Sequence, residues 1–134
     1  MNCYCGQQEP FYNCCLKVHT GKNHAKTAEQ LMRARYSAFA SSNVDFIKRT
    51  MKSPALDKFS KKDTKLWLKK VSWLRLEVLR SEKGLEHDSE GWVEFKAFYK
   101  QDGKNHVIHE TSYFKNIESV WYYIGEVQEG LNGK

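Results

Sequence analysis

Hydrophobic residues recur along this chain first with the period of a helix and later with that of a strand. Over residues 27–39 they return every three or four positions, which predicts a helix that buries one face. Thr27 followed by Gln30 has the pattern of a capping box at its start. Shorter helices are expected over residues 43–52 and from Ser60 onward.

The third of these helices is expected to turn Leu66 and Trp67 toward the core, and after it the apolar period changes to two. The alternation predicts four strands, which lie around residues 74–78, 93–99, 106–114 and 120–124. Asp102-Gly103 between the second and third is typical of a two-residue hairpin turn. Helices followed by a meander of antiparallel strands predict an α+β fold, with the helices packed on one face of a sheet.

The totals narrow the class of protein. A chain of 134 residues with 40% hydrophobic, 13% aromatic and 28% charged residues can bury a core, which argues against a disordered protein. No apolar run approaches the ~20 residues that cross a bilayer, and the N-terminus lacks a secretory signal pattern. We therefore expect a cytoplasmic protein without a membrane partner. The net charge of +6 is too small to indicate nucleic-acid binding on its own.

All four cysteines lie close to the N-terminus, at Cys3, Cys5, Cys14 and Cys15. Disulfides are disfavoured because the cytoplasm keeps thiols reduced and a bridge between adjacent cysteines is strained. Two short pairs joined by a loop suit a tetrahedral zinc site, in which four thiolates leave no coordination position open. The pattern therefore predicts a structural Zn²⁺ site. A chance cluster of buried or reactive thiols is the alternative.

Several segments carry a resemblance to known families. Residues 3–6 and 12–15, Cys-Tyr-Cys-Gly and Tyr-Asn-Cys-Cys, resemble the SEC-C motif, a zinc module also found at the C-terminus of the SecA translocation ATPase. Residues 25–39, 91–97 and 109–114 resemble the bacterial YchJ family. The resemblance implies a zinc knuckle followed by a nuclear-transport-factor-2-like (cystatin-like) cone, whose curved sheet wraps a long helix.

The resemblance implies that the chain has three parts. Residues 1–22 form the SEC-C-like zinc-binding motif, residues 23–128 form the cone domain, and residues 129–134 form a flexible tail. Cones of this type usually enclose a pocket, which different relatives use for catalysis, for binding or for dimerisation. Fold analogy does not choose among these uses.

Two charged residues are predicted to face the core. Arg35 falls within the apolar stripe of the first helix, and a two-residue turn at Asp102-Gly103 would place Glu110 opposite Phe95, on the buried face of the sheet. Buried charges are costly unless they pair or line a wet cavity. The favoured interpretation is an Arg35–Glu110 ion pair, and the alternative is a cone pocket in which both are polar groups. The residues assigned to this pair or pocket are Arg35, Glu110, Tyr36, Trp73, Phe95 and Ser112.

Other polar residues offer weaker signals. His109 is expected at the surface, because neighbours on a strand point to opposite faces, and His19 could support a thiolate of the metal site. Lysines recur at helical spacing and predict a basic surface, which is either solvated or binds an anionic partner. The lysines of this face are Lys58, Lys61, Lys62, Lys65 and Lys69.

No complete catalytic motif is present, so catalytic residues are not assigned and enzyme activity is left open. The leading hypothesis is a small zinc-binding adaptor module that contacts a protein or RNA partner. The alternative is a small-ligand binder or enzyme that uses the cone pocket around Arg35 and Glu110. A homodimer formed through outer aromatic residues such as Tyr113, Trp121 and Tyr123 is also left open.

Overall fold

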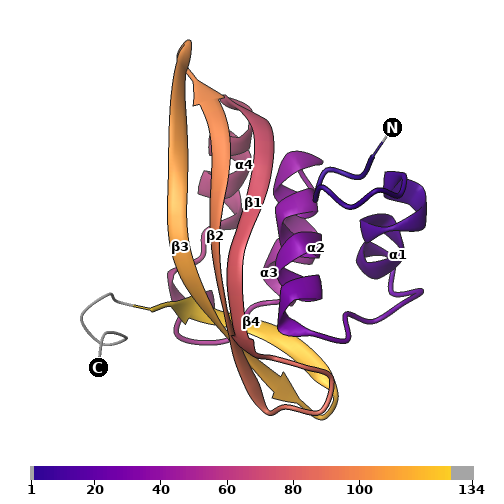
Figure 1. Ribbon diagram of the computed structural model, residues 1–134. Helices are drawn as coiled ribbons and strands as arrows, with labels where there is room; N and C mark the ends of the chain where they lie inside the picture. The colour runs from indigo at the N-terminus through magenta and orange to yellow at the C-terminus, as the bar shows by residue number, and fades with distance from the viewer. Residues whose placement is uncertain (1, 128–134) are drawn as a thin grey trace.

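The computed structural model describes residues 2–127, which form two layers, with helices covering one face of an antiparallel sheet (Figure 1). The strands follow one another in the sheet as they do in the chain, in the order β1-β2-β3-β4. Their bounds are β1 (Val71–Lys83), β2 (Glu90–Gln101), β3 (Lys104–Ile117) and β4 (Val120–Glu126). The predicted α+β meander is therefore confirmed. The expected tail, residues 129–134, lies outside the described residues.

The helical layer and the N-terminal segment comprise six helical elements within residues 2–127. They are η1 (Phe11–Asn13), α1 (Cys15–His19), α2 (Ala28–Ala40), α3 (Val44–Arg49), η2 (Leu56–Lys58) and α4 (Lys61–Leu68). Helix α1 lies within residues 1–22, which were expected to form the zinc-binding motif. In this described range no helix combines the length and the apolar character that spanning a membrane requires.

Helix α2 lies between the sheet and the N-terminal segment (Figure 1). Thr27 caps it by accepting a hydrogen bond from the Gln30 amide at 3.0 Å, as the capping pattern predicts. One face packs on the sheet, and the opposite face, which includes Ala34 and Ser37, is buried by the N-terminal segment. The prediction of a single buried face was incomplete because small residues on the second face gave no hydrophobic stripe.

The shorter helices differ from expectation in detail. Asn43 caps α3 as predicted, but the helix ends at Arg49, and Met51 instead pairs with Tyr123 of β4. In α4 the Ser60 cap is confirmed, whereas Leu66 is 49% exposed and Leu68 takes the buried position. The assignment of Leu66 to the core was therefore wrong.

The register of the central hairpin follows from its turn. Asp102 and Gly103 form the two-residue turn, and both have positive φ, +56° and +76°, which this class of hairpin requires. Phe95 lies opposite Glu110, as the turn predicted. Glu110 therefore belongs to the concave, helix-covered side of the sheet.

Two bulges interrupt β1. The pairing with β2 shifts by one residue between Trp73 and Arg75 and again between Val78 and Arg80, so Leu74 and Leu79 are the extra residues. Both leucines are largely exposed. The expected regular alternation through Leu74 is wrong, since the first bulge changes the phase of the strand.

Candidate metal centre and cone pocket

The four cysteine sulfurs converge on one point. The Sγ atoms of Cys3, Cys5, Cys14 and Cys15 all lie within 4.8 Å of one another, and the Cys5–Cys14 separation is 3.7 Å. Four thiolates at ~2.3 Å from a tetrahedral zinc ion are about 3.8 Å apart, so the spacing fits such an ion. None of the four is in a disulfide. The cluster could therefore hold a metal ion, as the sequence predicted.

Local turns bring the two cysteine pairs together. The Gly6 amide donates to the Cys3 carbonyl at 3.0 Å, and Gly6 has φ +94°, which a glycine adopts without strain. The Cys3 amide donates to the Glu9 carbonyl at 2.6 Å, which folds the loop back. A single helical turn, η1, then places Cys14 beside the first pair. Besides the cysteines, the described part of this short segment packs only Val18 and part of Phe11 into the core, so a bound ion would add substantially to its stability.

Crowding of the thiols sets their protonation. Hydrogen bonding from Cys15 lowers the pKa of Cys5 to about 5, whereas burial raises the pKa of Cys14 to about 12. The pKa of Cys15 is also raised, chiefly because its thiol donates to Cys5. One thiolate therefore disfavours the ionisation of its neighbours. A divalent cation would remove this repulsion and allow all four sulfurs to bind as thiolates.

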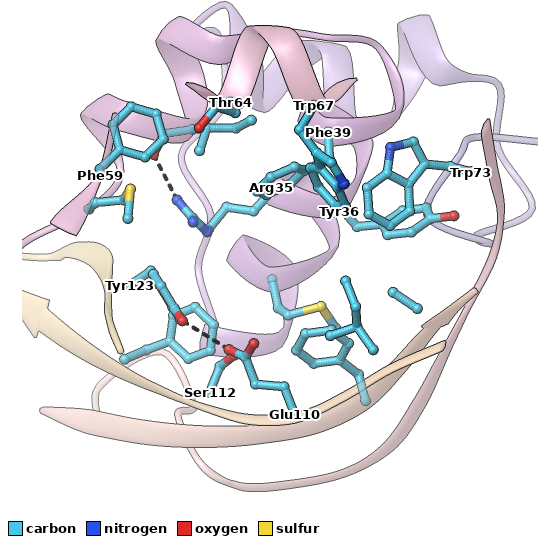
Figure 2. Close-up of a pocket in the computed structure, with 17 residues that line it drawn as sticks. Arg35, Tyr36, Phe39, Phe59, Thr64, Trp67, Trp73, Glu110, Ser112 and Tyr123 are labelled. Atoms are coloured by element: carbon cyan, nitrogen blue, oxygen red, sulfur yellow. Dashed lines mark hydrogen bonds between the residues drawn. The ribbon is translucent and has the colours of Figure 1, made fainter. Parts of the chain in front are cut away.

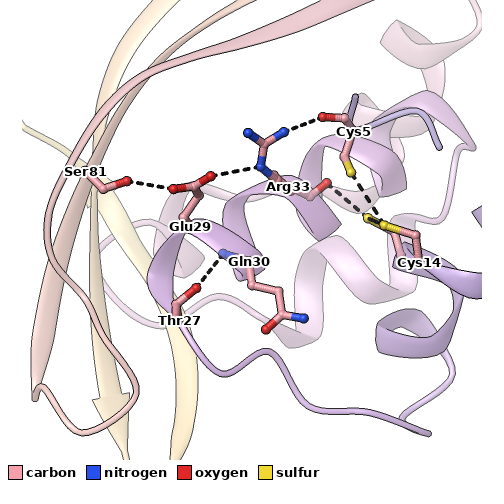
Figure 3. A network of polar contacts seen from close by, with 8 residues as sticks. Cys5, Cys14, Thr27, Glu29, Gln30, Arg33 and Ser81 are labelled. Carbon is pink, nitrogen blue, oxygen red and sulfur yellow. Dashed lines mark hydrogen bonds and ion pairs between the residues drawn. The ribbon is translucent and has the colours of Figure 1, made fainter. Parts of the chain in front are cut away.

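Helix α2 supplies the immediate surroundings of the cluster (Figure 3). The Arg33 guanidinium donates to the Cys5 carbonyl at 2.6 Å and pairs with Glu29 at 3.0 Å. The Ser37 hydroxyl lies 3.6 Å from the Cys3 sulfur. His19 has another role than the one expected, because its Nε2 contacts the Ala34 carbonyl at 2.8 Å and not a sulfur. The cysteine segment is thus fixed to α2 by polar contacts.

A cavity of about 340 Å³ lies on the other side of α2, between the helices and the concave face of the sheet (Figure 2). All six residues assigned to a pocket or ion pair line it, namely Arg35, Tyr36, Trp73, Phe95, Glu110 and Ser112. Its volume is at the lower end of the range for small-molecule sites, about 300–1,000 Å³. All six side chains therefore lie around one cavity, as the pocket interpretation expected.

Arg35 enters this cavity from α2. Its Nη1 donates to the Ile47 carbonyl at 2.8 Å and to the Thr50 hydroxyl at 2.6 Å, and its guanidinium lies over the Tyr123 ring, 4.5 Å from the centroid. Burial lowers the pKa of Arg35 to about 10, so the side chain stays charged near neutral pH. Within residues 2–127, its Nε and Nη2 have no hydrogen-bond acceptor.

Glu110 enters from the opposite side, on β3 (Figure 2). Its Oε2 accepts hydrogen bonds from the Ser112 hydroxyl at 2.5 Å and from the Tyr123 hydroxyl at 2.9 Å. Burial, followed by the charge of Glu110, raises the pKa of Tyr123, which keeps this hydroxyl protonated as a donor. Among the described residues, Arg35 forms no ion pair with Glu110. The favoured ion-pair prediction was wrong in this respect, because Tyr123 lies between the two charges.

Aromatic side chains form one wall of the cavity. Trp73 packs edge-to-face against Tyr36 and Trp67, with ring centroids 5.6 Å apart in both pairs, and tilted against Phe39 at 6.0 Å. The Trp67 indole donates to Gln101 at 3.2 Å, whereas the buried Trp73 indole N–H has no acceptor in the described part of the chain. This wall is therefore almost wholly apolar.

The sequence did not identify Tyr123 as a pocket residue or Thr50 as a hydrogen-bond partner of Arg35. An outer position of Tyr123 and Trp121 was left open, but Tyr123 lines the cavity and Trp121 is buried, with its indole donating to the Lys26 carbonyl. The alternation of β4 fixed which residues share a face but not which face is concave. The predicted burial of Arg35 was the available signal for Thr50, because a buried arginine requires hydrogen-bond acceptors.

The remaining predicted residues lie at the surface. His109 is exposed and pairs with Glu94 at 2.7 Å, as expected of a surface histidine. Lys61 pairs with Asp45 at 2.6 Å. All five lysines of the predicted face, Lys58, Lys61, Lys62, Lys65 and Lys69, are exposed on η2, α4 and the end of α4.

Comparisons with known proteins agree with this architecture. Residues 27–126 match the middle NTF2-like domain of YchJ. A UPF0225 protein of Vibrio cholerae serotype O1 is 38% identical over 98% of this chain and 89% of its own length, and one of Geobacter sulfurreducens is 36% identical over 90% and 75%.

Two solved structures have the same fold. A SEC-C motif containing protein from Rhodopseudomonas palustris has a TM-score of 0.85 and 31% identity, covering 95% of this chain and 98% of that one. A sec-c motif containing protein from Psychrobacter arcticus has a TM-score of 0.80 and 30% identity, covering 93% and 81%. The chain therefore belongs to the YchJ (UPF0225) family of SEC-C motif proteins.

Proposed function

We propose that this protein binds a small molecule in its cone pocket, and that a structural Zn²⁺ ion on the four cysteines stabilises the helix that forms one side of that pocket. One observation carries this assignment: the charged Arg35 guanidinium faces a cavity of about 340 Å³ with two N–H-bearing nitrogens unused within the described residues. Arg35 is only 7% exposed, and a charge buried to this extent is costly unless it is paired. A ligand that accepts from Arg35 would reduce that cost.

The zinc ion has a structural role in this proposal. Three of the four cysteines are buried, and they pack against α2 beside Arg33 and Ser37. Four thiolates complete a tetrahedral shell and leave no position for substrate. Helix α2 also carries Arg35 on its other face, so an ion that fixes the N-terminal segment also supports the pocket.

Native mass spectrometry of untagged protein tests both parts, since one spectrum reports a bound metal ion and a retained small molecule. The fluorescent dye ANS serves as a second probe of the apolar cavity. The pocket-filling variant is Ala97→Phe, because Ala97 is buried and lines the cavity. The matched control is Val107→Phe, because Val107 is 51% exposed and the same side chain is introduced there outside the cavity.

We expect Ala97→Phe to lose the retained molecule and most ANS binding while keeping one zinc ion and its circular dichroism spectrum. Val107→Phe should retain both. Equal ANS binding by Ala97→Phe and the wild type, with no retained molecule in either, would contradict the pocket function.

The lysine face favours a second candidate function, that of an adaptor for an anionic partner such as RNA. Of its five exposed lysines, only Lys61 has an ion-pair partner within residues 2–127. A variant with all five changed to glutamine should bind a single-stranded RNA oligonucleotide more weakly, and wild-type binding should fall steeply with salt. Fluorescence anisotropy at two salt concentrations measures this, and salt-independent or unchanged binding would count against the adaptor.

A further inference from the structure

We propose that the pocket is built for a zwitterion, namely a free amino acid with a large apolar side chain, with its carboxylate at Arg35 and its ammonium group at Glu110. This assignment rests on the proposed ligand-binding function and adds the chemical class of the ligand. It follows from the two charges that the cavity holds apart (Figure 2).

The Arg35 side of the cavity suits a carboxylate. The two contacts to Ile47 and Thr50 both use Nη1 and hold the guanidinium plane in place, while the Tyr123 ring supports it from one side. Nε and Nη2 are left without acceptors in the described residues, and they form the edge of the guanidinium that binds a carboxylate in bidentate geometry. Neutral acceptors would satisfy the hydrogen bonds but leave the buried charge uncompensated.

The Glu110 side of the cavity suits an ammonium group. Both hydrogen bonds that Glu110 accepts, from Ser112 and Tyr123, end on Oε2. Oε1 has no donor among residues 2–127, so it remains a free acceptor at the cavity. A carboxylate already oriented by two hydroxyl donors is pre-organised to accept from a cation.

The two charges do not neutralise each other by contact. Arg35 stacks on the ring of Tyr123, and the hydroxyl of the same ring donates to Glu110, so the tyrosine separates guanidinium from carboxylate. The cavity therefore has no net charge from this pair but has a strong internal dipole. A ligand with one charge would satisfy one end and leave the other unpaired, whereas a zwitterion satisfies both.

The aromatic wall suits an apolar side chain. Phe39, Trp67 and Trp73 line the cavity, and apolar groups make up most of the remaining lining. At about 340 Å³ the cavity has room for one ligand of the size of an aromatic amino acid. Trp67 and Trp73 meet edge-to-face, a geometry to which a further aromatic ring can add.

Isothermal titration calorimetry with three related probes tests this inference on the wild-type protein. L-tryptophan carries both charges, tryptamine lacks the carboxylate, and indole-3-propionate lacks the ammonium group. We expect L-tryptophan to bind at least about tenfold more tightly than either analogue, because tryptamine brings no acceptor to Arg35 and indole-3-propionate brings no cation to Glu110.

Two variants should each remove the advantage of L-tryptophan over one of the analogues. Glu110→Gln keeps the shape of the side chain and should weaken L-tryptophan about tenfold or more while leaving indole-3-propionate unchanged. Arg35→Gln should weaken L-tryptophan and indole-3-propionate but not tryptamine. Arg80→Gln is the control, since Arg80 lies at the surface in pairs with Glu82 and Glu94. If Arg35→Gln does not fold, the affinities of the three probes for the wild type and for Glu110→Gln still test the zwitterion assignment.

The outcomes separate this inference from the proposed function. Indole-3-propionate or tryptamine binding as tightly as L-tryptophan would overturn the zwitterion assignment. ANS binding that Ala97→Phe abolishes, together with no binding of any of the three probes, would also overturn it, although the pocket function would stand. Loss of the pocket function itself would instead appear as ANS binding unaffected by Ala97→Phe.

Discussion

The cysteine cluster and the cone pocket lie on opposite faces of α2, and they bury polar groups in contrasting ways. In the cluster, four identical groups converge until all sulfurs lie within 4.8 Å of one another. In the pocket, two unlike charges, Arg35 and Glu110, enter from opposite layers and are separated by Tyr123. Convergence of like groups selects one small ion of opposite charge, whereas separation of unlike groups leaves space for a molecule with two ends.

The contrast also concerns what each region does for the rest of the chain. The cluster joins a short N-terminal segment to α2 and adds to the apolar packing of Phe11 and Val18. The pocket is a gap within the core, lined by residues from α2, α3, α4 and all four strands. A structural site thus stabilises what surrounds it, while a binding pocket costs stability until a ligand fills it.

Removal of the metal should have the largest effect. Zinc held at 1,000 times its dissociation constant contributes about 4 kcal/mol, so a chelator should lower the melting temperature by on the order of 15 °C. Cys5→Ser should reproduce this loss, because Cys5 is fully buried in the cluster. Metal analysis by mass spectrometry and thermal denaturation by circular dichroism measure both. An unchanged melting temperature after verified metal removal would show that the metal at the cysteine cluster does not stabilise the fold.

Double-mutant cycles in the pocket should give an intermediate effect. Glu110 and Tyr123 share a hydrogen bond of 2.9 Å, so Glu110→Gln with Tyr123→Phe should show a coupling energy of about 1–2 kcal/mol. Arg35 and Glu110 are not in contact but both contact Tyr123, so Arg35→Met with Glu110→Gln should show a smaller coupling energy, of about 0.5 kcal/mol. Urea denaturation provides the free energies of unfolding. Stronger coupling in the second cycle than in the first would show that Arg35 and Glu110 form a direct ion pair.

The smallest effect should come from His19, which lies between the cysteine segment and the helical layer. Burial lowers its pKa below the ordinary value of 6.5, so the folded protein holds it neutral. A depressed folded-state pKa means that its contribution to stability is present above pH 6.5 and is lost as the pH falls below that value.

For one such proton, stability changes by at most about 1.4 kcal/mol per pH unit. His19→Gln should therefore flatten the fall in melting temperature between about pH 7 and pH 5, relative to the wild type. Both proteins should be saturated with zinc, since acid also protonates the thiolates. Parallel pH profiles would assign the acid sensitivity to the cysteines alone.

How much the sequence predicted depends on the range of the interactions involved. The cysteine cluster and the helix caps at Thr27 and Ser60 depend on residues close in sequence, and the structure bears them out. The position of Glu110 followed from one turn, because Asp102-Gly103 sets the register of a whole hairpin. The place of Tyr123 depends on how β4 packs under α2 and on its pairing with Met51, which no local pattern encodes.

Helix α2 and strand β1 show the same limit. Ala34 and Ser37 are buried because the N-terminal segment packs over them, and small residues of this kind give no apolar stripe. The bulges at Leu74 and Leu79 changed which residues of β1 face the core, although the composition of the strand is unremarkable for a regular one. Contacts between distant segments, not local propensity, decide these features.

The bulges of β1 bear on whether this protein stays dispersed at high concentration. β1 is an edge strand of 13 residues, and a flat edge of that length would offer a continuous row of backbone donors and acceptors to another copy of the chain. The extra residues at Leu74 and Leu79 break this row into short pieces. A variant in which both leucines are deleted would straighten the edge and should aggregate at lower concentrations than the wild type.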